Sequence, residues 1–190
     1  MNTFVPGTPA PQGDVRRRPL PFLFPFLFLS LAVAAPGTAQ DLEEEGIARG
    51  AVPAAAAVED LDGGALQLRE LTEGRPAVVQ FWATWCPVCR ALEPRVRAAH
   101  DRFGDDVAFV VVAVGVAQTP AQVRQHIARH QTPGEVVWDG GGEAVRAYEA
   151  PGTGFVVVLD AGGRVAYTGT GGDQDLEAVL ERVVSSGSSP

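Results

Sequence analysis

Lysine is missing from this chain of 190 residues, and all 15 basic residues are arginine. A mechanism that needs a lysine amine, such as Schiff-base formation, is therefore excluded. Acidic residues number 23, which gives a formal net charge of −8. A surface of that sign argues against nucleic acid or an anionic membrane surface as a partner.

Sulfur is also scarce, with two cysteines, Cys86 and Cys89, and one methionine, Met1. If the chain is exported, no other cysteine remains to form a structural disulfide or to carry a lipid anchor. Any thiol chemistry must therefore come from the segment Trp-Cys-Pro-Val-Cys at positions 85–89.

The N-terminus has the parts of a secretory signal. Arginines at 16–18 precede an apolar run over 20–35, and small residues follow up to Ala39. The run is shorter than the roughly 20 residues of a spanning helix, and Pro21 and Pro25 interrupt it. We therefore expect export to the periplasm or another extracytoplasmic compartment with cleavage after Ala39, or, as the alternative, an uncleaved membrane anchor.

Composition predicts four parts of the chain. An acidic and then Ala/Gly/Pro-rich stretch predicts a linker, and the Ser/Gly-rich end predicts a disordered tail. The predicted boundaries are a signal peptide over 1–39, a linker over 40–57, a folded domain over 58–184 and a tail over 185–190.

Hydrophobic spacing predicts an α/β domain. Leu92, Val96, Ala99 and Phe103 recur at helical spacing and predict a helix over 87–103. The apolar run 107–114 is typical of a strand buried on both faces. We expect a central mixed β-sheet flanked by helices, with an N-terminal β-hairpin extension turning at residues 62–64. Further predicted strands lie at 77–83, 135–138, 155–160 and 164–168. Further predicted helices begin at Thr119 and Asp173 as N-caps, with a short one at 142–148.

The two cysteines fall where a predicted strand turns into a helix. Unpaired backbone N–H groups and the helix dipole favour a thiolate at that position, and the thiolate is the attacking species in disulfide exchange. We expect Cys86 to be the exposed nucleophile and Cys89, one turn inward, to be the resolving thiol. Pro87 suits the first helical turn, where its missing N–H costs nothing.

Two other interpretations of the cysteine pair are weak. Structural zinc needs four ligands, and the only further candidates are His100, His126 and His130, which we expect on the surface away from the cysteines. A purely structural disulfide would close too short a loop to stabilise the fold much. We expect neither a metal nor a cofactor.

The segment Phe-Trp-Ala-Thr-Trp-Cys-Pro-Val-Cys-Arg at 81–90 resembles the active-site segment of the TlpA/ResA-like branch of the thioredoxin superfamily. The resemblance extends over about 56–184. It implies a thioredoxin-like fold and an extracytoplasmic thiol–disulfide oxidoreductase that reduces protein disulfides through mixed disulfides. It also implies a role in cytochrome c maturation and a membrane thiol transporter as electron donor. We expect a monomer.

The resemblance also assigns an environment to the dithiol. Trp82 and Trp85 flank the reactive sulfur, and Pro94 kinks the helix by removing one hydrogen bond. The dipeptide Pro87-Val88 between the cysteines holds no histidine that would stabilise the thiolate further, which favours a reductase over a strong oxidant.

Three departures from the family pattern concern this environment. Gly154, preceded by Thr153, stands where the family has a cis-proline, and a non-proline cis bond costs about 2.5–4 kcal/mol, so we expect Gly154 to be trans or mobile. Gln80 stands where thioredoxins have a buried carboxylate that accepts the proton of the resolving thiol, and an amide cannot take up that proton. Glu93 lies one residue after the position where many relatives have a glutamate. One residue along a helix is a rotation of about 100°, so Glu93 is either a surface residue or a displaced catalytic residue.

Rival functions use the same fold. One is a non-catalytic binding module, which the changes at Gly154 and Gln80 favour. Another is a copper-handling protein with Cys86 and Cys89 as soft ligands for Cu(I). A peroxidase is disfavoured, because the spacing of the dithiol suits disulfide exchange better.

Overall fold

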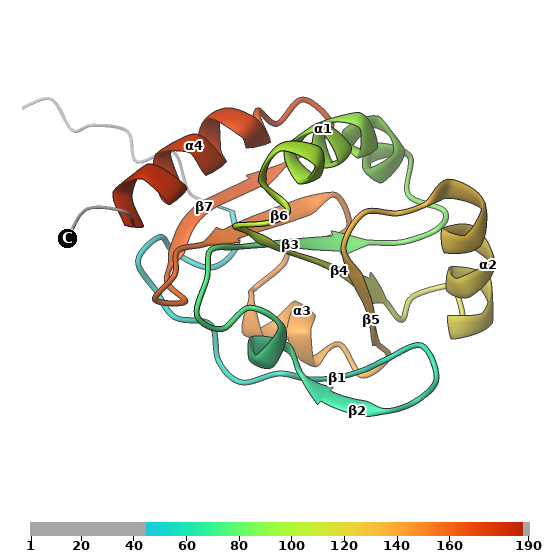
Figure 1. Ribbon diagram of the computed structural model, residues 1–190. Helices are drawn as coiled ribbons and strands as arrows, with labels where there is room; N and C mark the ends of the chain where they lie inside the picture. The colour runs from blue at the N-terminus through green and yellow to red at the C-terminus, as the bar shows by residue number, and fades with distance from the viewer. Residues whose placement is uncertain (1–44, 188–190) are drawn as a thin grey trace, which may run out of the picture. The chain divides into compact units, whose positions relative to one another are not determined.

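The computed structural model describes residues 45–187, which belong to a unit spanning residues 40–190. Its framework is a seven-stranded mixed sheet in the order β2-β1-β5-β4-β3-β6-β7 (Figure 1). The strands are β1 (Ala57–Glu59), β2 (Ala65–Gln67), β3 (Ala77–Trp82), β4 (Ala108–Val114), β5 (Glu135–Asp139), β6 (Phe155–Leu159) and β7 (Val165–Thr170). The helices are the 3-10 turn η1 (Leu68–Leu71), α1 (Pro87–Phe103), α2 (Pro120–His130), α3 (Glu143–Ala147) and α4 (Leu176–Gly187).

The centre of the sheet is apolar on both faces. β3 pairs with β4 in parallel and with β6 antiparallel, and every residue of these three strands is buried. Strands covered on both faces read as continuous apolar runs rather than alternating ones. This is why the unbroken valine-rich runs of β4 and β6 predicted strands.

Helices cover the two faces unequally. α1, α2 and α4 lie over one face, and α3 and η1 lie over the other (Figure 1). Helix α1 has the predicted bounds, and its four predicted inward residues are buried. Thr119 caps α2 as predicted, because its hydroxyl accepts the Gln122 N–H.

Some predicted details are corrected. Asp173 does not cap the last helix: the Asp175 carboxylate accepts the Ala178 N–H, and α4 starts directly after it. Pro94 lies inside α1, as the resemblance implies, and the kink expected there stays a prediction. The predicted signal peptide lies outside the described residues.

The predicted linker and tail are partly structured. From Ile47 onward, the stretch predicted as linker packs into the domain, since Ile47 and Ala56 are buried in its core. Gly46 lies against the Phe155 ring, where a Cβ would meet the ring at its outermost carbon. At the other end, α4 includes residues 185–187, and the Ser186 hydroxyl donates to the Val183 carbonyl. The low-complexity composition of both segments predicted no regular structure. Small and polar residues can still pack where the rest of the fold offers a surface to contact.

Candidate active site

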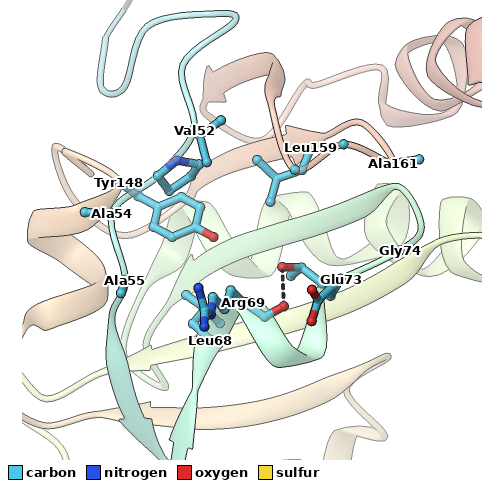
Figure 2. A pocket seen from close by; sticks show the side chains of 14 residues that line it. Val52, Ala54, Ala55, Leu68, Arg69, Glu73, Gly74, Tyr148, Leu159 and Ala161 are labelled. Carbon is cyan, nitrogen blue, oxygen red and sulfur yellow. Dashed lines mark hydrogen bonds between the residues drawn. The ribbon is translucent and has the colours of Figure 1, made fainter.

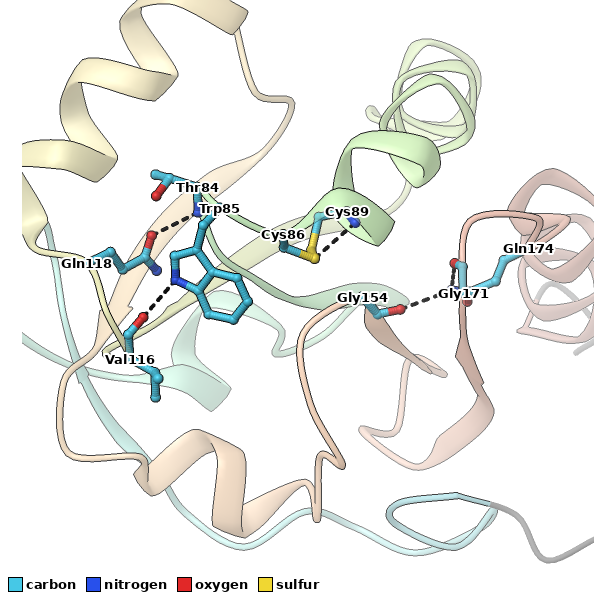
Figure 3. The surroundings of a disulfide bond; sticks show 9 residues. All are labelled: Thr84, Trp85, Cys86, Cys89, Val116, Gln118, Gly154, Gly171 and Gln174. Carbon is cyan, nitrogen blue, oxygen red and sulfur yellow. Dashed lines mark hydrogen bonds between the residues drawn. A yellow bond between two sulfur atoms is a disulfide. The ribbon is translucent and has the colours of Figure 1, made fainter.

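Cys86 and Cys89 form a disulfide at the start of α1, four residues after β3 ends, with their Cα atoms 5.3 Å apart. Cys86 is the N-cap of the helix, and its Sγ accepts the Cys89 N–H at 3.0 Å (Figure 3). Pro87 occupies the first helical turn, as expected. Negative charge on Cys86 Sγ would therefore meet a backbone donor and the positive end of the helix dipole.

Both cysteines are buried in this oxidised state. Cys86 is 2% exposed, so the expectation that it is the exposed member of the pair is wrong for the disulfide form. The reason is packing, since both cysteines lie in a cluster with Trp82, Val111 and Val123. A reacting partner must displace part of this cover to reach the Cys86 sulfur.

The cover around the disulfide carries exposed apolar side chains. Trp85 is 45% exposed, and its indole Nε1 donates to the Val116 carbonyl at 2.8 Å (Figure 3). Val88 and Val116 are exposed as well. The indole is thus held in one orientation beside the cysteines, and Trp82, which packs in one cluster with both cysteines, is buried.

Gly154 has a backbone that only glycine adopts without strain. Its φ is +84°, and a Cβ at this position would lie 2.6 Å from Val88 Cγ1. Residues 45–187 contain no cis peptide bond, so Gly154 is trans, one of the two states expected. Thr153 precedes it at intermediate burial.

The backbone groups of Gly154 are engaged inside the protein. Its N–H donates to the Phe81 carbonyl at 2.8 Å, and its carbonyl accepts from Gly171 N–H and Gln174 Nε2, both at 3.3 Å. These three bonds fix the loop beside the dithiol. They also leave neither group of Gly154 free to pair with an incoming peptide strand.

Two buried glutamines, which sequence analysis did not single out, tie the loops around the site. Gln118 accepts the Thr84 N–H at 2.8 Å and donates to the Val114 carbonyl at 2.7 Å. Gln174 donates to Gly154 and Gly171, and it accepts the Tyr167 hydroxyl at 3.2 Å. No sequence signal distinguishes them from other loop glutamines, because their role depends on loops that meet only in the fold.

Glu93 does not stand alone on the surface of α1. Its carboxylate accepts from Arg97 at 2.9 Å, and the same guanidinium donates to the carbonyls of His130 and Gln131 at the end of α2. Arg97 thus caps α2, with Glu93 holding it in place. Gln80 is buried in β3, on the face that α1 covers.

His126 lies beside the site, contrary to the expectation that the histidines are remote from it. Its ring packs edge-on against Trp82 at a centroid distance of 4.9 Å and stacks on His130 at 4.3 Å. Burial lowers the pKa of His126, and the electrostatic effects of His130, Arg90 and Arg129 lower it further. The Glu93 carboxylate raises this pKa but does not cancel the other effects. His126 thus packs on Trp82, which lies in one cluster with the dithiol.

The described part of the chain holds no group of three or more metal-ligating His, Cys, Asp or Glu side chains. Among the same residues, no helix is both long and apolar enough to cross a membrane.

A pocket of about 470 Å³ lies apart from the dithiol, near the N-terminal end of β3 (Figure 2). Its lining includes Tyr148, Leu68, Leu159 and Gly74, of which Gly74 precedes β3 by three residues. Disulfide exchange needs no such recess, because it joins a sulfur atom of the enzyme to one on a macromolecule. The position of this pocket therefore says nothing about the redox site.

The order of strands and the position of the cysteine pair between β3 and α1 define a thioredoxin-like fold. A solved structure with this fold comes from a secreted disulfide oxidoreductase of Mycobacterium tuberculosis that is homologous to DsbE of E. coli. Its TM-score is 0.57 at 21% identity, with 66% of this chain and 94% of that chain covered. The chain belongs to the Redoxin family, whose model matches residues 48–184.

Two sequence relatives are thiol–disulfide oxidoreductases and so indicate the class of enzyme. ResA, a thiol–disulfide oxidoreductase of Halalkalibacterium halodurans, is 26% identical over 128 residues, covering 66% of this chain and 72% of that protein. Sporulation thiol–disulfide oxidoreductase A of Bacillus subtilis is 27% identical over 124 residues, covering 64% and 72%. The chain is a TlpA/ResA-like thiol–disulfide oxidoreductase that carries a Cys-x-x-Cys pair.

Proposed function

We propose that this protein is an exported reductase of protein disulfides in which Cys86 attacks and Cys89 resolves. The position of Cys86 Sγ carries the proposal: it is the N-cap of α1 and accepts the Cys89 N–H at 3.0 Å. Such a sulfur is stabilised as a thiolate, whereas Cys89 has no comparable donor among the bonds of the site.

The cycle balances with these two sulfurs. The Cys86 thiolate attacks a substrate disulfide, the substrate S–S bond breaks, and one substrate thiolate leaves while a mixed disulfide forms. Cys89 then loses its proton and attacks Cys86 Sγ, which releases the second substrate thiolate. The Cys86–Cys89 disulfide seen here is the product, and a dithiol donor returns the two electrons. Gln80 cannot take the Cys89 proton, so that proton must leave to solvent or another base.

Export rests on the arginine cluster at 16–18 and the apolar run over 20–35. The compartment we propose is the periplasm or its equivalent outside the cytoplasm, with the signal either cleaved or kept as an anchor. By its TlpA/ResA resemblance, the protein would act on apocytochromes during cytochrome c maturation, with a membrane thiol transporter as donor. We propose that it acts as a monomer.

Trapping tests the roles of the two cysteines. Cys89→Ser should accumulate substrates as mixed disulfides on Cys86, which reducing agent releases and mass spectrometry identifies. Cys86→Ser is the matched control and should trap nothing. Equal trapping by both variants, or trapping by Cys86→Ser alone, would refute the assignment of the nucleophile.

The direction of the reaction is tested by equilibration with glutathione buffers. A reductase should have a potential well below that of the strong oxidants, which lie near about −120 mV. A value at that end of the range would make the protein an oxidant and overturn the proposal of a reductase.

A further inference from the structure

The turn that carries β3 into α1 has a backbone donor that the turn itself cannot satisfy. Its closing hydrogen bond runs from the Cys86 N–H to the Ala83 carbonyl at 3.1 Å, so the Thr84 N–H inside the turn needs another acceptor. The side-chain carbonyl of Gln118 accepts this N–H at 2.8 Å (Figure 3). The turn that places Cys86 at the helix N-terminus is therefore fixed by a residue 34 positions beyond Thr84.

The side chain of Gln118 is itself held at both polar ends. It is 8% exposed, and its amide Nε2 donates to the Val114 carbonyl at 2.7 Å. One end of the amide thus bonds the end of β4, and the other end bonds the turn before Cys86. A buried amide whose two ends are both bonded has one orientation. Gln118 can therefore act as a rigid link between the two segments.

Gln118 also shapes the loop between β4 and α2. The preceding residue, Ala117, has a φ of +52°, a left-handed conformation that is unfavourable for a residue with a Cβ. The bond from Gln118 to the Val114 carbonyl spans this residue and closes the loop over it. Inside the closed loop, the Val116 N–H donates to the same carbonyl at 2.8 Å. Loss of the Gln118 bonds would let Ala117 relax and would move the Val116 carbonyl.

The position of this loop decides where the Trp85 indole lies. Trp85 Nε1 donates to the Val116 carbonyl at 2.8 Å, so the indole is bonded to the loop two residues before Gln118 (Figure 3). Trp85 directly precedes Cys86 and is 45% exposed. A protein that brings a sulfur atom to Cys86 meets this side chain beside it.

We propose that Gln118 is a positioning residue for disulfide exchange with protein substrates. It holds the loop after β4 against the turn before Cys86. Through the Val116 carbonyl, it keeps the Trp85 indole beside the dithiol, where the indole contacts the incoming protein. This role rests on the proposed function, because it requires that protein disulfides react at Cys86.

Gln118→Met separates the hydrogen bonds of Gln118 from its packing, because methionine is also unbranched and of similar length but has no amide group. Gln174→Met is the matched control. Gln174 is also a buried glutamine that donates to backbone carbonyls, but those carbonyls belong to Gly154 and Gly171. Urea unfolding of both variants measures how far each substitution destabilises the fold as a whole.

The first readout is the hydrogen exchange of the Trp85 indole N–H, measured by NMR on the oxidised full chain. We expect Gln118→Met to speed this exchange about fivefold, the factor that corresponds to one hydrogen bond between neutral groups, although the indole bonds Val116. Gln174→Met should leave the exchange unchanged. A rate in Gln118→Met equal to that of the wild type, or an equal rise in both variants, would overturn the proposal.

The second readout compares the rates at which the dithiol form reduces two disulfides. One is insulin, and the other is bis(2-hydroxyethyl) disulfide, which has no polypeptide for the indole to contact. Gln118→Met should slow the reduction of insulin several-fold and leave that of the small disulfide unchanged. Added to Trp85→Phe, it should cause no further loss with insulin, because both changes act through the same side chain. Equal losses with both disulfides, or a full further loss in the double variant, would refute a role through Trp85.

The two readouts separate this role from the proposed function. If the wild type reduces neither disulfide, the proposed function fails. The indole exchange of Gln118→Met does not depend on that activity and still decides whether Gln118 positions Trp85. If the wild type reduces insulin and Gln118→Met reduces it at the same rate, the positioning role fails while the proposed function stands.

Discussion

The two ends of β3 differ in how closely the residues around them pack. At the end that leads to Cys86, the Trp85 indole bonds Val116 and the backbone of Gly154 bonds three internal groups. At the end that starts near Gly74, a pocket of about 470 Å³ opens, and Tyr148 is among the residues that line it. One end is packed and joined by internal hydrogen bonds, and the other is hollow.

The difference follows from what each end can do. A disulfide reacts by direct contact with a sulfur atom on another protein, so the dithiol needs a rigid frame and an apolar surface rather than a cavity. A small ligand, in contrast, needs a recess that buries most of its surface. Substitutions at each end of β3 test this difference between the two ends.

The largest effect is expected from the sulfur itself. Cys86→Ser should lower insulin reduction by at least about a thousandfold, because a hydroxyl is a far weaker nucleophile than a thiol at neutral pH. Tyr148→Phe, at the hollow end, should leave the rate unchanged. Residual reduction by Cys86→Ser at the wild-type rate would show that the packed end does not carry the chemistry.

Crowding the dithiol end should cost stability. Gly154→Ala places a Cβ 2.6 Å from Val88 Cγ1 at a φ of +84°, and we expect a loss of about 3 kcal/mol in the free energy of unfolding. Gly163→Ala is the matched control, since its φ is +74° but its Cβ would meet nothing within 4 Å, and it should cost about 1 kcal/mol. Urea unfolding measures both.

A double variant separates the clash from the backbone strain. Adding Val88→Ala to Gly154→Ala should recover the part of the loss that exceeds the Gly163→Ala control, because the opposing methyl groups are gone. If Val88→Ala and Gly154→Ala are simply additive, the contact between these two residues does not close the site.

A smaller effect is expected from the bond that orients the exposed indole. Trp85→Phe removes the donor to the Val116 carbonyl, and we expect it to lower stability by no more than about 1 kcal/mol and to slow insulin reduction several-fold. Stopped-flow reduction and urea unfolding measure the two quantities. An unchanged rate would show that the fixed indole does not take part in reaching the substrate.

The smallest effect is a dependence of stability on pH through His126. Its pKa is lowered in the folded state, so the unfolded chain binds the proton first as pH falls below about 6.5. Acidification through this range should therefore destabilise the wild type more than His126→Gln, and only slightly, because the ring is partly exposed. The urea midpoints of the wild type and of the variant are compared at pH 8, where residue 126 is uncharged in both proteins, and at pH 5. A wild type that gains stability relative to the variant on acidification would contradict the sign.

Local patterns predicted most of the fold. The spacing of Leu92, Val96, Ala99 and Phe103 predicted α1 with its observed bounds, and Thr119 predicted the start of α2. These signals are local, because capping and helical periodicity depend on neighbours in sequence. Where the signal was weak, as at Asp173 or in the small residues before Ala57, the packing of distant segments decided the outcome and the prediction was wrong.

The cysteine pair was visible in the sequence, and its surroundings were not. By itself, the sequence determined the spacing of Cys86 and Cys89 and the turn from strand into helix that places a sulfur at a helix N-terminus. Only the tertiary structure decided that Cys86 is covered in its oxidised state, that Gly154 rests on Val88, and that His126 reaches Trp82. Those contacts join segments tens of residues apart, and no local pattern encodes which side chains meet across them.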